Sequence, residues 1–170
     1  MNLTRRLRWL GLTLFIVFVD RATKAWVESR PADYFPHAVI PNIFEIVSSR
    51  NPGIAFSFLA GSGSSLVRAL LIIGTIAIIG FVAWLLVAGQ GESALYTAGL
   101  ALILGGATGN LTDRILHGAV TDFLAVWVRF LPWHIFNPWP TFNVADSAVT
   151  IGAIFIVFDV LFGKQHPRES

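Results

Sequence analysis

Four long apolar stretches dominate the sequence and cover residues 7–27, 66–87, 93–114 and 144–163. A helix needs about 20 residues to cross the hydrocarbon core of a bilayer. A helix also satisfies its own backbone hydrogen bonds, which an environment without water requires. The four stretches therefore predict an all-α membrane protein with four transmembrane helices.

The composition supports the membrane class. Hydrophobic residues make up 55% of the chain, charged residues only 13%, and the mean hydropathy is +0.68. A soluble domain carries about 25% charged residues. The absence of cysteine excludes disulfides and thiolate metal sites. The net charge of +2 comes from scattered Lys and Arg residues without a basic patch, so we expect no binding to nucleic acid.

We expect one polytopic membrane domain, residues 1–170, with two long segments between spans, 28–65 and 115–143. In the first of these, residues 39–47 and 54–59 have the composition of short strands. Turn-forming residues lie between them and predict a small β-hairpin platform on the membrane surface.

The second long segment is rich in tryptophan, with Trp127, Trp133 and Trp139. Large apolar residues from Phe123 to Leu131 approximate one helical face. Tryptophan favours the boundary between lipid and water. We therefore predict an interfacial helix or a flap over residues 125–140.

The N-terminal residues predict the orientation. Arg5, Arg6 and Arg8 precede the first apolar stretch. Basic residues beside the first span favour the cytoplasmic side. No small-x-small cleavage pattern follows the stretch, so we expect the first helix to be retained. An even number of spans then puts both termini in the cytoplasm and both long segments outside it.

Four carboxylates lie in or beside the apolar stretches: Asp20, Asp113, Asp122 and Asp146. A carboxylate at membrane depth is costly and is usually functional. Asp122 and Asp146 flank the tryptophan-rich segment on the same side of the membrane. Singly, each could cap a helix or pair with an Arg. As a close pair they would share one proton, so one could activate water while the other donates to a carbonyl oxygen.

Other polar residues accompany these carboxylates. Gly105 and Gly109 form a GxxxG pair, which allows close helix packing. Asn110 and Arg114 follow at a spacing of four residues and share a helix face, where they could bind peptide carbonyls or a phosphate. Asn143 precedes the fourth stretch and is a candidate helix cap.

Asp20 and Lys24, also four residues apart, can pair within the first helix. The four His residues are dispersed, so their spacing predicts no metal site. From the residues alone, two functions stay open. One is an enzyme that activates water at the membrane surface, and the other is a small proton-coupled carrier or channel subunit that uses the same carboxylates as a relay.

Five ordered motifs resemble those of the lipoprotein signal peptidases, the type II signal peptidases of bacteria. The resemblance covers nearly the whole chain. The matching motifs are Asp20-x-x-Thr23-Lys24, Asn51-x-Gly53-x-Ala55-Phe56-Ser57, Gly105-Gly106-Ala107-x-Gly109-Asn110-x-x-Asp113-Arg114, Val120-x-Asp122-Phe123 and Phe142-Asn143-x-Ala145-Asp146-Ser147.

The resemblance implies an intramembrane aspartyl endopeptidase that needs no metal or cofactor. Such an enzyme removes the signal peptide of diacylglyceryl-modified prolipoproteins by cutting before the lipidated cysteine. It implies a monomer in the bacterial inner membrane, in contact with lipid, with its active site near the extracytoplasmic face. By position, Asp122 and Asp146 would form the catalytic dyad. The substrate or the dyad would be positioned by Asn51, Gly53, Asn110, Arg114 and Asn143, with support from Asp20, Lys24 and Asp113.

Overall fold

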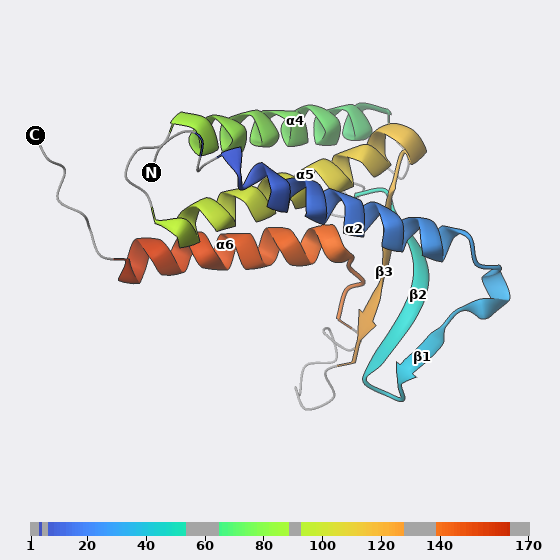
Figure 1. The fold of residues 1–170 in the computed structure, drawn as a ribbon. Coiled ribbons are helices and arrows are strands. Elements are labelled where there is room, and N and C mark those ends of the chain that lie inside the picture. Colours follow the sequence, from blue (N-terminus) through green and yellow to red (C-terminus); the bar gives the residue numbers. More distant parts are fainter. Residues whose placement is uncertain (1–3, 5–6, 54–64, 89–92, 128–138, 164–170) are drawn as a thin grey trace, which may run out of the picture.

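The computed structural model describes residue 4 and residues 7–53, 65–88, 93–127 and 139–163. Four long helices and a three-stranded sheet make up the described part of the chain (Figure 1). The helices are α2 (Leu10–Glu28), α4 (Ser65–Ala88), α5 (Ala94–His117) and α6 (Val144–Phe162), with a short 3-10 helix η1 (Ala32–Tyr34) after α2. The strands are β1 (His37–Ile40), β2 (Phe44–Asn51) and β3 (Val120–Val126). Each long helix begins and ends within a few residues of a predicted span.

Helix α5 lies at the centre and packs against α2, α4 and α6. Small residues allow this close packing. A Cβ atom added to Gly99 would lie 2.7 Å from the carbonyl oxygen of Gly152 in α6. A Cβ atom added to Gly105 would lie 2.8 Å from the Cβ of Ile16 in α2. The predicted GxxxG packing therefore joins α5 to α2, since Gly109 faces Asp20 in the same way.

Helices α4, α5 and α6 are long and apolar enough to cross a membrane. Helix α2 has 19 residues but carries four charged ones, at positions 20, 21, 24 and 28. Asp20 and Lys24 turn inward and are fully buried, whereas Leu14, Phe15 and Phe18 are exposed. An apolar outer surface with buried charges inside suits a helix surrounded by lipid on one face.

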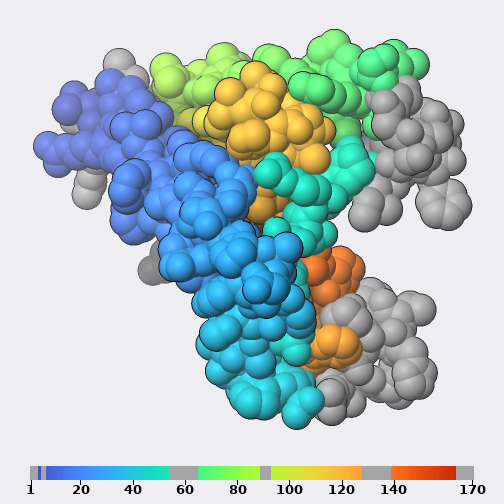
Figure 2. Space-filling model, turned by 90° about the vertical axis from the view of Figure 1, so that its right-hand side faces the viewer, coloured from blue at the N-terminus to red at the C-terminus, as the bar shows by residue number. Residues whose placement is uncertain are grey.

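The sheet has the order β1-β2-β3, and both neighbouring pairs are antiparallel. It lies at one end of the helices, and its strands run across their direction (Figure 1). Helix α2 begins and α6 ends at the opposite end (Figure 1). Figure 2 views the molecule from the sheet end, with α4 at the top and the strands β1 and β2 below it.

The predicted hairpin differs in its boundaries from the observed one. Residues 39–47 do not form one strand, because the chain turns between Ile40 and Phe44. Asn42 has a φ of 63°, a left-handed conformation that Asn tolerates in turns. Strand β2 then continues to Asn51, through most of the predicted turn. The second predicted strand, residues 54–59, lies outside the described residues.

The predicted helical face that begins at Phe123 is wrong for its first residues. Phe123, Leu124 and Val126 belong to β3, which pairs with β2. The other edge of β3 also has a partner, because the N–H groups of Phe123 and Leu124 donate to the carbonyl oxygen of Phe142. Backbone pairing on both edges outweighs the local helical pattern. The flap predicted for residues 125–140 lies mostly outside the described residues.

Candidate active site

Asp122 lies in the buried strand β3, and its side chain is 1% exposed. Strand β2 supplies one of its partners, because the side-chain amide of Asn51 donates to Asp122 Oδ2 at 3.0 Å. Asn51 Oδ1 in turn accepts the backbone N–H of Gly53 at 2.9 Å. Gly53 has a φ of 95°, which favours glycine at this turn. The turn after β2 therefore orients the amide that holds Asp122.

Asp146 lies in the first turn of α6, where Asn143 is the N-cap residue. The two residues form a capping box. The backbone N–H of Asp146 donates to Asn143 Oδ1 at 2.9 Å, and the backbone N–H of Asn143 donates to Asp146 Oδ2 at 3.2 Å. A carboxylate at this position also interacts favourably with the helix dipole. The capping box at the start of α6 thus fixes the position of the Asp146 carboxylate.

Asn143 also contacts the other carboxylate. Its side-chain amide donates to Asp122 Oδ1 at 2.8 Å, and the side chain is fully buried. The same nitrogen lies 3.2 Å from Asn110 Oδ1 and 3.3 Å from the carbonyl oxygen of Thr121. One residue therefore bonds to both Asp122 and Asp146 and holds β3 beside the start of α6.

Asn110 of α5 links this pair to a buried ion cluster. Its amide nitrogen donates to Asp146 Oδ1 at 2.8 Å, and its Oδ1 accepts from Lys24 Nζ at 3.0 Å. Lys24 is fully buried and forms ion pairs with Asp20 at 2.8 Å and with Asp113 at 2.9 Å. The predicted pair of Asp20 and Lys24 is present, and Asp113 joins it.

The ion cluster ties three helices together. Asp20 Oδ1 accepts the backbone N–H of Ala145 at 2.9 Å, which joins α2 to the start of α6. Asp113 of α5 pairs with Arg21 of α2 at 2.9 Å. Breaking a buried pair by removing one partner costs several kcal/mol, typically about 3–5. The cluster therefore supports the helices on which Asn110 and Asp146 lie.

Arg114 lies beside the carboxylate pair, and its Nε is buried without a hydrogen-bond partner among the described residues. It lines a cavity of about 300 Å³ between α4, α5 and α6, together with Asn110 and Asp146. Thr75 of α4 and Thr150 of α6 contribute hydroxyl groups to the same cavity. An unpaired guanidinium donor beside a carboxylate can bind a carbonyl group of a ligand.

The environment of Asp122 raises its pKa above the ordinary value of 3.8. Burial is the largest cause, because it disfavours the ionised form. The charge of Asp146 acts in the same direction, whereas the hydrogen bonds from Asn51 and Asn143 oppose it. Asp122 therefore keeps its proton to a higher pH than an exposed Asp.

The structure brings nearly all of the predicted site residues into one connected network, with Gly53 and Arg114 at its edge. Sequence reasoning missed Thr121 and Glu28. Thr121 donates its hydroxyl to Glu28 Oε1 at 2.8 Å and its backbone N–H to Asp113 Oδ2 at 3.2 Å. The position of Thr121 beside Asp122 was the one available signal. Among the described residues, no three His, Asp or Glu side chains form a group that could hold a metal ion.

Comparisons with known proteins agree with each other. The family described as "Signal peptidase (SPase) II" matches residues 12–162. The chain is 39% identical to the lipoprotein signal peptidase of Pseudomonas putida over 94% of the chain and 90% of the relative. It is 40% identical to that of Solibacter usitatus over 94% of both.

Two solved structures of bacterial membrane enzymes share the fold. One has a TM-score of 0.75 and 28% identity and covers 96% of this chain and 93% of its own. The other has a TM-score of 0.77 and 29% identity and covers 91% and 93%. The similarity in fold thus extends over nearly the whole chain.

Proposed function

Because the chain belongs to the signal peptidase II family, whose members are aspartic proteases, we propose that it removes signal peptides from prolipoproteins with Asp122 and Asp146 as its catalytic dyad. The observation that carries the assignment of the dyad is the position of Asn143, which donates to both carboxylates. The proton-coupled carrier is not favoured, because the relatives named above are peptidases.

The roles of the two carboxylates follow from their surroundings. Asp122 is buried, and its pKa is raised, so it is the group that retains the shared proton. Asp146 is only half-buried and lines the cavity beside Arg114, so it is the group that water can reach. Asp146 therefore acts as the general base, and Asp122 as the general acid.

The reaction then proceeds in two steps. Asp146 takes a proton from a water molecule as its oxygen attacks the scissile carbonyl carbon, while Asp122 donates to the carbonyl oxygen. The tetrahedral intermediate collapses when the C–N bond breaks and the proton held by Asp146 passes to the leaving amine. Asp122 recovers its proton from the hydroxyl group of the intermediate as the new carboxyl group forms. The dyad ends with the single proton with which it began.

Arg114 and Asn110 extend the site toward the substrate. The guanidinium of Arg114 lines the cavity that contains Asp146, so it can bind a backbone carbonyl next to the scissile bond. Asn51 and the turn at Gly53 bound the site on the side of the sheet. These contacts fix the peptide relative to the dyad, which is a large part of any hydrolytic rate enhancement.

We further propose that α2 is a fourth span and that both termini are cytoplasmic in the bacterial inner membrane. The sheet and the dyad then lie at the extracytoplasmic face. Trp139 donates its backbone N–H to the carbonyl oxygen of Val126 at 2.9 Å, so the two ends of the predicted flap lie together beside the site. The protein acts as a monomer in contact with lipid.

Incubation with a defined substrate tests this function. Purified protein is incubated with a diacylglyceryl-modified prolipoprotein, and the masses of the products are measured by mass spectrometry. We expect a mature chain that begins with the lipidated cysteine, together with a free signal peptide. Asp146→Asn, which keeps the shape of the side chain, should yield no product. Equal cleavage by this variant would remove Asp146 from the mechanism, and no cleavage by the wild-type protein would refute the function.

A further inference from the structure

Two cavities meet at Asp146, on different sides of α6. The first is the cavity of about 300 Å³ between α4, α5 and α6. The second is larger, about 560 Å³, and lies between the first turns of α6 and the segment that precedes it. Asp146 and Thr150 line both cavities. A substrate bound at Asp146 can therefore extend in two directions.

The chemistry of the two cavities differs. The first contains the amide of Asn110 and the guanidinium of Arg114, which suit the carbonyl groups of a peptide. Among the described residues that line the second cavity there is neither an amide side chain nor a cation. Its walls are the apolar side chains of Trp139, Phe142 and Ile151, among others. The second cavity is therefore better suited to a hydrocarbon.

Hydroxyl groups lie on the second cavity next to its apolar walls. Thr141, Ser147 and Thr150 line it together with Asp146. The hydroxyl of Ser147 already donates to the carbonyl oxygen of Asn143 at 3.0 Å. Thr141 and Thr150 can donate to ester carbonyls, which are weak acceptors that need few partners. The cavity thus offers polar groups near the dyad and hydrocarbon walls beside them.

We propose that this second cavity, the Trp139–Ile151 groove, binds an acyl chain of the diacylglyceryl group. The proposal rests on the proposed function, in which the scissile bond directly precedes the lipidated cysteine. The glyceryl group is then only a few bonds from the scissile carbonyl. Its acyl chains must leave the dyad through an apolar opening, and the signal peptide occupies the cavity that contains Asn110 and Arg114.

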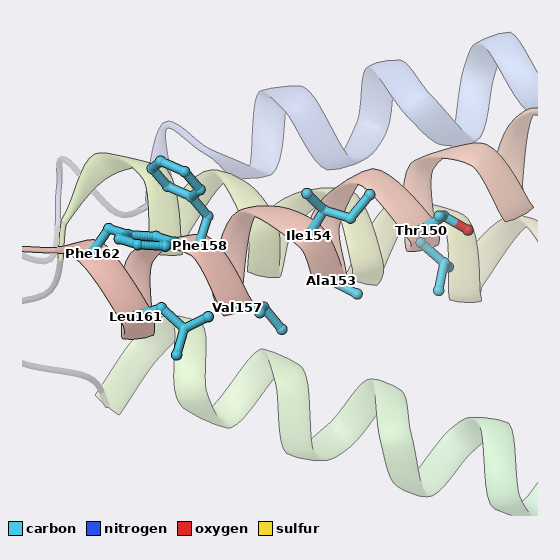
Figure 3. A pocket seen from close by; sticks show the side chains of 8 residues that line it. Thr150, Ala153, Ile154, Val157, Phe158, Leu161 and Phe162 are labelled. Carbon is cyan, nitrogen blue, oxygen red and sulfur yellow. The ribbon is translucent and has the colours of Figure 1, made fainter.

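A second apolar groove lies farther along α6 and provides the matched control. It runs from Val149 to Phe162 (Figure 3). Figure 3 shows Val157 and Leu161 on the side of α6 that faces α4, and Phe158 on the opposite side. Thr150 joins this groove to both cavities at Asp146, but Asp146 does not line it.

Selection among acyl chains in such a groove depends on how well each chain fits its shape. An acyl chain that leaves the bilayer exchanges one apolar environment for another, so burial alone supplies little affinity. A side chain that fills the groove would instead exclude the long chain sterically. Ile151 lines the Trp139–Ile151 groove and is 45% exposed, and Ile154 lines the second groove and is 58% exposed. Both side chains belong to α6.

The experiment compares wild type, Ile151→Trp and Ile154→Trp. Each purified protein cleaves two synthetic prolipoproteins that differ only in carrying octanoyl or palmitoyl chains, and kcat/KM is measured for both. For Ile151→Trp we expect the ratio of palmitoyl to octanoyl cleavage to fall by about tenfold, as one large side chain clashes with the longer chain. For Ile154→Trp the ratio should stay within about twofold of wild type.

Three outcomes would overturn the proposal. An unchanged ratio in both Trp variants would place the chains in bulk lipid, and a fall for Ile154→Trp alone would place them in the second groove. If Ile151→Trp cleaves neither substrate, Ile151→Ala is tested instead. This smaller side chain should widen the groove, so kcat/KM for a substrate with branched acyl chains should exceed that of wild type. An unchanged kcat/KM for that substrate would refute binding of the acyl chain in the groove. A wild-type protein that cleaves neither substrate would instead refute the proposed function.

Discussion

The ammonium group of Lys24 donates to Asn110 Oδ1 at 3.0 Å, and both side chains are buried. The amide nitrogen of Asn110 donates to Asp146 at 2.8 Å. The contact with Lys24 selects the orientation of the amide, because a cation can only face its oxygen. Lys24 of α2 thereby turns the amide nitrogen of Asn110 toward Asp146, which accepts its hydrogen bond.

Lys24→Met should strongly destabilise the protein. The substitution leaves Asp20 and Asp113 buried without their shared cation, so we expect a loss of about 3–5 kcal/mol in the free energy of unfolding. Unfolding in detergent, followed by circular dichroism, measures the loss. Arg50→Met is the control, because Arg50 is 51% exposed and lies 3.6 Å from Glu28. It should cost about 1 kcal/mol or less, and equal losses in both variants would contradict the role of the buried cluster.

Asp122→Asn should abolish cleavage without unfolding the protein. Asn keeps the size of the side chain but cannot carry the proton that the dyad shares. The loss of a general acid or base costs about 10²–10⁴-fold in rate. Single-turnover cleavage measures the effect, with exposed Asp33→Asn as a control that should cleave like wild type. Cleavage by Asp122→Asn above a tenth of the wild-type rate would exclude it from the dyad.

The pH dependence of cleavage should reflect the raised pKa of Asp122. Cleavage requires the retained proton, so activity should persist below this raised pKa and fall as the pH rises through it. Asn51 stabilises the ionised form and lowers the pKa. Asn51→Ala should therefore raise the pKa further and move the alkaline limb of kcat/KM to higher pH. Exposed Ser48→Ala should not move it, and a shift of the limb to lower pH in Asn51→Ala would show that the roles are misassigned.

Asn143→Ser should separate helix capping from support of the dyad. Ser is a good N-cap residue, but it cannot donate an amide to Asp122. We expect a cost of about 1–3 kcal/mol from the acceptors left without a donor and a fall of about 10²-fold in cleavage. Ser93→Ala removes the N-cap of α5, far from the dyad. Ser93→Ala should lower the free energy of unfolding by about 1 kcal/mol and leave the cleavage rate of the folded protein unchanged. Similar cleavage rates in Asn143→Ser and Ser93→Ala would show that Asn143 is only a helix cap.

Treatment with a strong chelator should leave cleavage unchanged. Each of the four carboxylate oxygens of Asp122 and Asp146 accepts one N–H group, from Asn51, Asn110 and Asn143. These donors hold both carboxylates in place, and each oxygen keeps a second lone pair for the shared proton or the attacking water. A dyad of this kind activates water without a metal ion. Kinetics before and after prolonged chelation, with readdition of divalent cations, provide the measurement. Loss of activity that a cation restores would replace the dyad mechanism with a metal-assisted one.

The helices and most of the residues proposed for the site could be predicted from the sequence. The backbone groups of each apolar run must form hydrogen bonds within the run itself, so the length of the run sets the length of the helix. Helices α4 and α6 therefore begin and end within about one residue of their predicted limits. Charged and amide residues are costly in such runs, which made Asp20, Lys24 and Asn110 stand out before any contact was known. The capping role of Asn143 also depends only on its neighbours along the chain.

The tertiary structure decided the features that depend on distant partners. Residues 120–126 form a strand because β2 and Phe142 satisfy the backbone groups on their two edges. Thr121 matters because Glu28, 93 residues away, accepts its hydroxyl. The link from Asp122 through Asn143 to Asp146 requires the sheet to lie against the start of α6. Such contacts depend on packing between elements, which a local pattern does not encode.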